Sequence, residues 1–202
     1  YSSKTDGGGI HLGHQNTNHI WNRANGQIFV NVSNVENYNI TGTQYDDVFE
    51  GRSGNDTFNG GAGNDILTGG VGKDTLTGGL GRDRFDYRVL TDSLLDNFDL
   101  ITGLNATTGN DLFLVTTARS GFNNVTTAVA TLDATGIAAR LTTATFTANS
   151  AAQFTFGTGT NTRTFVAIND AIAGFSATTD AIIEVTGLTG TLGTSNFTTA
   201  LV

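Results

Sequence analysis

Four nine-residue repeats follow one another without a gap over residues 51–86, and no other feature of the sequence constrains the fold as strongly. Each repeat has the pattern G-G-x-G-x-D-x-U-x, in which U is a large apolar residue. The aspartates recur nine residues apart, at Asp56, Asp65, Asp74 and Asp83. The apolar positions keep the same spacing, at Phe58, Leu67, Leu76 and Phe85. This fixed period predicts a solenoid whose repeats bury their apolar side chains by stacking.

The chemistry of one repeat points to a metal ion. Glycines at the first, second and fourth positions allow positive φ angles and a tight turn that directs carbonyl oxygens inward. The last three residues favour a short strand with one apolar side chain pointing inward. Two repeats complete one coil, so aspartates two repeats apart stack on one edge and repel each other. A hard cation relieves that repulsion, and calcium prefers carbonyl and carboxylate oxygens. The sequence therefore predicts an all-β fold, a calcium-binding parallel β-roll.

Glycine-rich repeats also have a second interpretation. Gly-Gly and Asn-Asp pairs mark turns in an ordinary β-solenoid, and they occur in flexible linkers. Four consecutive copies in strict register favour the calcium-binding interpretation. The register extends upstream, because counting back nine residues from the first of the four aspartates reaches Asp47, with Val35, Ile40 and Phe49 at apolar positions. We expect residues 42–50, GTQYDDVFE, to form the first calcium-competent turn.

The nonapeptides resemble those of the RTX (hemolysin-type) calcium-binding proteins. Residues 35–115 resemble that family's usual order of a degenerate first coil, regular repeats and a less regular exit. The segment after Asp86, YRVLTDSLL, keeps Asp92 and Leu94 in phase with the repeats, and Asp96, Asp99 and Asp111 come later among apolar strand residues. In that family a calcium ion lies between turns two repeats apart, bound by backbone carbonyls and by the sixth-position Asp.

The resemblance implies particular ligands in this chain. The stacked pairs would be Asp47 with Asp65, Asp56 with Asp74, Asp65 with Asp83 and, less regularly, Asp74 with Asp92; Asp99 is a further candidate ligand. The carbonyl ligands would be those of Arg52, which replaces the second glycine of its repeat, and of Gly54, Gly61, Gly63, Gly70, Gly72, Gly79 and Gly81. The fifth position, often Asn or Asp, is Lys73 and Arg82 in the last two repeats. We expect those two sites to lose a side-chain ligand and to bind calcium more weakly.

Composition narrows the function. A formal net charge of −8 argues against nucleic-acid binding, which needs a basic surface. Cysteine is absent, which excludes disulfide and thiol chemistry. No apolar run approaches the roughly 20 residues of a membrane-spanning helix. The chain has no Met and begins at Tyr1, so we expect a processed product or a part of a longer protein.

The segment before the repeats carries the three histidines of the chain, His11, His14 and His19. A His-x-x-His pair is one element of a zinc site, but here no Cys or carboxylate accompanies it, which favours a polar surface. Residues 27–32 alternate apolar and polar side chains and predict a half-buried strand.

The segment after the repeats is rich in Thr and Ala and nearly uncharged. Residues 133–141 predict a short capped helix, residues 153–156 and 163–168 a hairpin around GTGTN, and residues 181–186 another strand. This half resembles the region after the repeats in type I secreted RTX proteins, including a final L-x-x-x-x-F at Leu192 to Phe197. It also resembles a C-terminal module of cyanobacterial surface proteins. A β-rich cap over the open end of the coil would have the same composition.

We therefore expect three parts in the chain. Residues 1–41 form N-terminal strands and a first coil, residues 42–100 the RTX β-roll, and residues 101–202 a capping, secretion or surface-assembly domain with at most a short helix. No H-E-x-x-H, G-x-S-x-G or Walker motif occurs, so we predict that the chain is not an enzyme.

Three functions remain open. The favoured one is a secreted structural protein of the cell surface or extracellular matrix, in a surface layer, sheath or filament, that folds and self-assembles as a homo-oligomer on calcium binding. The second is a fragment of an adhesin. The third is the C-terminal region of a secreted hydrolase whose catalytic domain lies upstream.

Folding of residues 30–115 is predicted to require calcium, because the stacked aspartates repel one another without it. Circular dichroism should show the β-sheet signal lost in chelator and restored by calcium at about 10⁻⁴ to 10⁻³ M, the range of weak extracellular sites. A signal that chelation leaves unchanged would contradict the interpretation.

Overall fold

The computed structural model describes residues 10–11, 19–22, 28–31, 37–107 and 110–201, and for the first three segments it describes the strands but not their side chains. Val35 and His14 therefore lie outside the described residues, as do the side chains of His11 and His19, and the interpretation of the histidines stays a prediction. Among the described residues no helix is long and apolar enough to cross a membrane.

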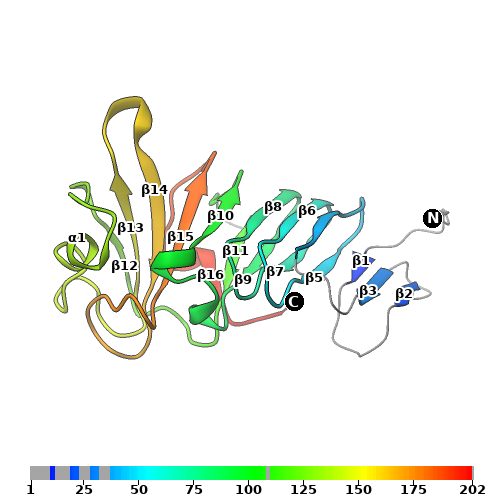
Figure 1. The fold of residues 1–202 in the computed structure, drawn as a ribbon, viewed down its shortest axis with the longest axis horizontal. Helices are drawn as coiled ribbons and strands as arrows, with labels where there is room; N and C mark the ends of the chain where they lie inside the picture. Colours follow the sequence, from blue (N-terminus) through cyan, green and yellow to red (C-terminus); the bar gives the residue numbers. More distant parts are fainter. Residues whose placement is uncertain (1–9, 12–18, 23–27, 32–36, 108–109, 202) are drawn as a thin grey trace.

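The repeats form the predicted β-roll. Each repeat contributes one strand, and successive strands alternate between two parallel sheets, as Figure 1 shows. The sheet that we call sheet A contains β5 (Val48–Glu50), β7 (Ile66–Thr68) and β9 (Arg84–Asp86). The other, sheet B, contains β4 (Asn39–Thr41), β6 (Thr57–Ala62) and β8 (Thr75–Leu80). Residues two repeats apart are paired, for example Phe49 with Leu67 and Phe58 with Leu76.

The apolar position of each repeat fills the space between the two sheets. Phe49, Phe58, Leu67, Leu76 and Phe85 are all at most 1% exposed. Phe49 and Phe58, from opposite sheets, have ring centroids 5.3 Å apart. Burial of such a side chain stabilises a fold by roughly 1.5–3 kcal/mol. One apolar side chain per repeat therefore makes a narrow but continuous core.

The nine-residue register breaks after β9. Two short 3-10 helices, Leu90–Asp92 and Leu95–Asn97, form a loop before β10 (Asp99–Thr102) returns to sheet B beside β8. The loop is fixed to the C-terminal half, because the Ser93 hydroxyl donates to the Ile182 carbonyl at 2.6 Å. The prediction that Leu94 keeps the repeat phase is therefore wrong. Ile101 occupies the next core position and is completely buried.

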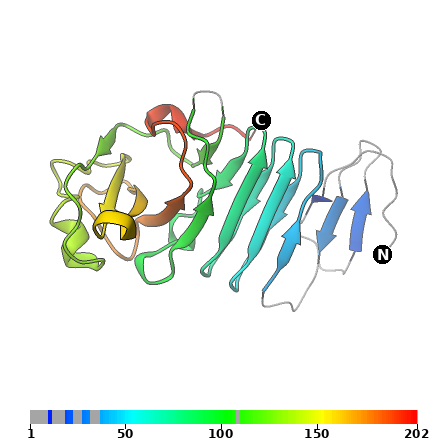
Figure 2. The ribbon, with the colours of Figure 1, turned by 90° about the horizontal axis from the view of Figure 1, so that it is seen from above.

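The C-terminal half extends both sheets. In sheet A, β11 (Leu112–Leu114) pairs with β9 and β16 (Phe197–Thr198) pairs with β11. In sheet B, β15 (Ala181–Thr186) lies beside β10 and continues through β14 (Arg163–Ile168) and β13 (Ala151–Phe156) to β12 (Phe122–Asn124). The turned view in Figure 2 shows this half widening beyond the regular coils.

Several sequence predictions are confirmed in this half. The predicted hairpin is present as the antiparallel pair of β13 and β14, and the strand predicted over residues 181–186 is β15. The short helix is α1 (Ala134–Ala138), whose N-cap Asp133 accepts a hydrogen bond from the Gly136 amide at 2.7 Å. Leu192 is buried in the main core, and the Phe197 ring stacks on Phe113 at 5.1 Å.

The N-terminal strands extend sheet A in the opposite direction. β1 (Ile10–His11) lies beside β5, followed by β3 (Ile28–Asn31) and β2 (His19–Asn22). The predicted strand over residues 27–32 is therefore present as β3. Sheet A crosses both proposed boundaries, at residues 41 and 100, so the division into three parts stays a prediction.

Arg52 offers a test of the turn geometry, because it has a φ of 78° where the equivalent residue of the next coil, Gly70, has 90°. A side chain in this region costs about 1–2 kcal/mol. Arg52→Gly should raise the free energy of unfolding in saturating calcium by about 1 kcal/mol, measured by urea denaturation. Gly70→Ala should lower it, because the added methyl would also overlap the Arg52 carbonyl oxygen. Equal effects of the two variants would contradict this geometry.

Candidate metal centre

The sixth-position aspartates stack along the two edges of the roll. We define the first edge by the turns at residues 42–47, 60–65 and 78–83, and the second edge by those at residues 51–56 and 69–74. On the first edge the Asp47 amide donates to Asp65 Oδ1 at 2.7 Å, and the Asp65 amide donates to Asp83 Oδ1 at 2.9 Å. On the second edge the Asp56 amide donates to Asp74 Oδ1 at 2.7 Å. The structure thus brings together the three pairs expected from the repeat spacing.

The second carboxylate oxygen of four aspartates is left without a donor. Oδ2 is buried and makes no hydrogen bond in Asp56, Asp65, Asp74 and Asp83, and these residues are at most 1% exposed. A buried polar atom without a partner costs about 1–3 kcal/mol, and a charged one costs more. The same unpartnered oxygen recurs at four equivalent positions. Because each one is unfavourable on its own, the recurrence indicates that a positively charged group binds there.

Backbone oxygens converge on the same places. A methyl group added at Gly51 would overlap both Asp56 Oδ2 and the Gly69 carbonyl oxygen. A methyl group at Gly60 would overlap Asp65 Oδ2 and approach the Gly78 carbonyl oxygen. The glycines therefore leave room where a carboxylate oxygen and a carbonyl oxygen meet. Hard oxygen ligands from both sources suit calcium.

Side chains alone do not make this centre. In the described part of the chain no three carboxylate, imidazole or thiolate groups gather at one point. A cation between two coils would need main-chain oxygens as well as the aspartates, in agreement with the choice of calcium over zinc or copper.

The carbonyls beside the carboxylates differ from those expected. They belong to the first glycine of a repeat, Gly60, Gly69 and Gly78, and the sequence interpretation omitted them. The Arg52 carbonyl accepts a hydrogen bond from the Val71 amide at 2.8 Å, and its oxygen keeps a second lone pair. It therefore stays a predicted ligand, as do the carbonyls of Gly54, Gly61, Gly63, Gly70, Gly72, Gly79 and Gly81.

The expected pair of Asp74 with Asp92 is not formed. The Asp74 amide donates to Asp99 Oδ1 at 2.9 Å, because the inserted loop delays the return of the chain to sheet B. Asp92 lies in that loop, on a 3-10 helix. Burial raises the pKa of both Asp74 and Asp99, and the negative charge of Asp92 adds to the effect.

The ladder of the first edge ends in a residue that the sequence interpretation did not assign. The Asp83 amide donates to Asp111 Oδ1 at 3.1 Å. The Gly-Asn-Asp sequence at residues 109–111, which repeats that at residues 54–56 and 63–65, is the signal that identifies this position.

The fifth position has a structural role. Asn55 Oδ1 accepts a hydrogen bond from the Lys73 amide at 2.9 Å, and Asn64 Oδ1 accepts one from the Arg82 amide at 3.0 Å. These Asn side chains are exposed and join successive coils. The expectation that Lys73 and Arg82 weaken calcium binding stays a prediction. They end a hydrogen-bond ladder, and Lys73 Nζ lies 5.2 Å from the centre of the Phe98 ring.

Burial changes the acidity of the aspartates. It raises the pKa of Asp65 to about 8, and the neighbouring charges of Asp83 and Asp47 add to the effect. Burial also raises the pKa of Asp74 and Asp83 to about 6 and that of Asp56 by a smaller amount. Without a cation, the stacked carboxyls therefore ionise at a higher pH than usual, and Asp65 resists ionisation at neutral pH.

The comparison with protein families agrees with the repeat pattern. A family described as "RTX calcium-binding nonapeptide repeat (4 copies)" matches residues 39–67 and 50–85. Among 23 matching chains of solved structures is the solution structure of the AlgE6R3 subunit from the Azotobacter vinelandii mannuronan C5-epimerase. That match has 19% identity and a TM-score of 0.48, and it covers 81% of this chain and 78% of the other. A search of curated proteins found no significant match.

The raised pKa values predict an unusual pH dependence in chelator. Between the ordinary value of 3.8 and the raised values, the folded calcium-free chain binds more protons than the unfolded chain. Its stability should be greatest below about pH 4 and should fall as the pH rises through 6 to 8. The unfolded chain and the calcium-bound chain are both ionised above about pH 5, so the calcium concentration at the folding midpoint should change little over the same range. Circular dichroism from pH 4 to 8 in chelator and in calcium measures both quantities, and a calcium-free stability that rises with pH would contradict the assignment.

Position in the ladder predicts the effect of single substitutions. Asp65 lies between Asp47 and Asp83, whereas Asp92 lies outside the ladder. Asp65→Ala should raise the calcium midpoint at least tenfold, which corresponds to about 1.4 kcal/mol. Asp92→Ala should change it much less. A calcium titration followed by circular dichroism compares them, and similar midpoints would show that the stacking register is wrong.

Proposed function

The chain carries RTX calcium-binding nonapeptide repeats, and from this premise we propose that it is a secreted structural protein of the cell surface or extracellular matrix that folds on calcium binding. The observation that supports the proposal best is the set of four buried, unpartnered carboxylate oxygens, which make the metal-free roll unfavourable. Calcium binding would then supply part of the folding free energy.

The proposed dependence on calcium suits export. Where calcium is scarce, an acidic and glycine-rich segment cannot bury enough apolar surface to offset the entropy of ordering, and it stays unfolded. Where calcium is abundant, carboxylates and carbonyls of successive coils are linked through the ion, and the roll becomes a rigid rod. The same ion would thus separate an unfolded form, competent for secretion, from a folded extracellular form.

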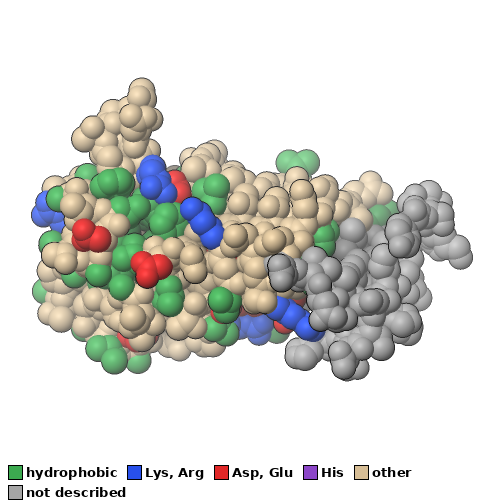
Figure 3. Space-filling model, in the orientation of Figure 1, with side chains coloured by type: hydrophobic (Ala, Val, Ile, Leu, Met, Phe, Trp, Pro, Cys, Tyr) green, Lys and Arg blue, Asp and Glu red, His purple; other side chains and the backbone are tan. Residues whose placement is uncertain are grey.

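The exposed surfaces of the roll favour assembly over catalysis. The outer side of sheet B presents uncharged residues in rows that cross the strands, and one of these rows consists of Thr41, Asn59, Thr77 and Thr102. Figure 3 shows the rod with few charged side chains on the face that is drawn. A flat and neutral surface of this kind offers little electrostatic repulsion to a second copy.

Sheet B also has an edge that no strand of the described residues covers. Among the described residues, β4 is its terminal strand, whereas sheet A continues beyond β5 into three more strands. The Gly42 amide donates to Asn59 and the Tyr38 carbonyl accepts from Thr57, so by alternation the Thr41 amide points away from β6. An unpaired strand edge of this kind can pair with another chain. We therefore propose that copies associate through β4.

Association should require calcium, because only the ordered coil presents the edge. Light scattering after size exclusion should show particles larger than a monomer in millimolar calcium and none in chelator. Thr41→Pro should reduce association because it removes the amide that points away from β6, whereas Thr41→Ala keeps that amide and should not. A protein that stays monomeric at high concentration in calcium would instead favour the adhesin or hydrolase-tail interpretation.

A further inference from the structure

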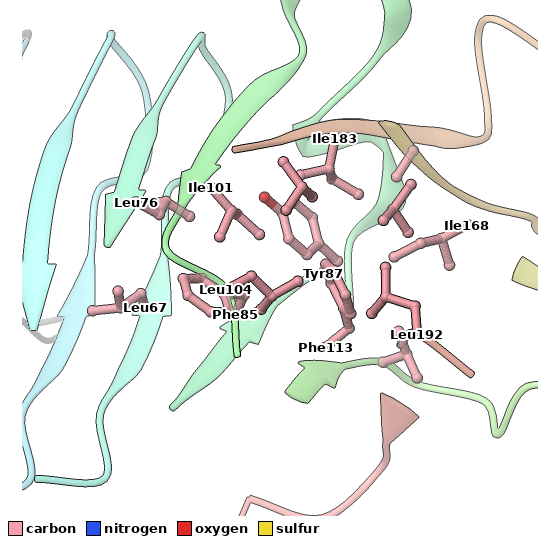
Figure 4. Packing of buried hydrophobic residues seen from close by; sticks show 14 of the residues in the cluster. Leu67, Leu76, Phe85, Tyr87, Ile101, Leu104, Phe113, Ile168, Ile183 and Leu192 are labelled. Atoms are coloured by element: carbon pink, nitrogen blue, oxygen red, sulfur yellow. The ribbon is translucent and has the colours of Figure 1, made fainter. Parts of the chain in front are cut away.

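Tyr87 lies where the aspartate ladder of the second edge ends. Its ring is buried at the junction between the roll and the C-terminal strands, and Figure 4 shows it between Ile101, Phe113 and Ile183. The ring centroid is 6.1 Å from that of Phe113, and the Tyr87 amide donates to the Leu114 carbonyl at 2.8 Å. The side chain is thus held on both sides, and its hydroxyl donates to Asp99 Oδ2 at 3.0 Å.

Asp99 has the same ladder geometry as Asp56 and Asp74 but a different second oxygen. In all three, Oδ1 accepts a hydrogen bond from the main-chain amide of the previous coil, from Tyr38, Asp56 and Asp74 respectively. Oδ2 has no partner in Asp56 and Asp74. In Asp99, which is only 1% exposed, the phenol hydroxyl is that partner.

We propose that the Tyr87 hydroxyl closes the second edge to calcium by occupying the carboxylate oxygen that an additional ion would bind. A hydroxyl satisfies a buried acceptor as a neutral donor. The proposal changes the assignment of Asp99 from a calcium ligand to the residue at which the row of ions stops.

The first edge shows the same arrangement at both ends. At its end, Asp111 Oδ2 accepts a hydrogen bond from the Asn105 amide at 2.8 Å. At its beginning, Asp47 Oδ2 accepts one from the Thr43 amide at 2.6 Å. Donors from the protein therefore take the place of the cation at both ends of the first edge and at the far end of the second. Asp56, at the beginning of the second edge, has no donor on Oδ2, and neither do Asp65, Asp74 and Asp83. The number of ions per chain would thus be set by these terminal donors as well as by the number of repeats.

This inference rests on the proposed role of the unpartnered oxygens as calcium ligands, so the experiment must separate the two. We would count bound calcium per chain by equilibrium dialysis with the whole chain, for the wild type, Asp74→Asn, Asp99→Asn and Tyr87→Phe. The wild type and Asp74→Asn test the proposed sites themselves. The other two variants test the closure by Tyr87. Circular dichroism in calcium shows which variants are folded.

Tyr87→Phe keeps the ring and its contacts but leaves Asp99 Oδ2 in the same state as Asp74 Oδ2. It should bind about one more calcium ion than the wild type, and adding Asp99→Asn should abolish that gain. Asp99→Asn alone should leave the count unchanged, while Asp74→Asn should lower it. One outcome would overturn only the closure by Tyr87. In it, the wild type binds calcium, Asp74→Asn binds less, and a folded Tyr87→Phe binds no more than the wild type. If Tyr87→Phe does not fold, Asp99→Asn alone decides, and a lower count in it would overturn the inference.

Discussion

The rest of the structure depends on the different roles of the two carboxylate oxygens in the stacked aspartates Asp56, Asp65, Asp74 and Asp83. Oδ1 accepts the main-chain amide of the previous coil and fixes the register of the roll, as Asp65 does for Asp47. Oδ2 is turned into the turn of its own repeat, against the first glycine, and finds no donor there. One side chain thus links two coils through the protein and leaves a negative site that needs a cation. In the proposed function, calcium binding at this site supplies part of the folding free energy of the roll.

This arrangement explains why the glycines cannot be replaced freely. The first glycine of a repeat lies where a side chain would collide with the carboxylate and with a carbonyl two repeats away, as at Gly51. The second and fourth glycines have φ angles that other residues avoid, and Arg52 is the exception in the repeats. The core contributes only one apolar side chain per repeat. The choice of residue is therefore restricted more in the turns than in the core.

The protein itself supplies a donor to three of the four terminal aspartates of the two edges. The donors are Thr43, Asn105 and Tyr87, whereas Asp56 has none on Oδ2. Both sheets pass into the C-terminal half through β10 and β11. The Ser93 hydroxyl and its hydrogen bond to Ile182 anchor the inserted loop to β15. These contacts join the roll to the C-terminal half of the chain. The C-terminal half therefore also covers one end of the coil.

The sequence by itself determined the regular part of this protein. A nine-residue period fixes which residues stack, because each coil repeats the last, and so the β-roll, its core positions and the pairs made by Asp47, Asp56 and Asp65 could be predicted. Local signals were sufficient for α1 and for the β13–β14 hairpin. The tertiary structure alone decided the path of the chain after Asp86. There the register depends on the length of chain that the inserted loop takes up, so Asp99 replaces Asp92. The partner of each Oδ2 depends on donors such as Tyr87, which adjoins Asp99 only after packing against Phe113 and β15.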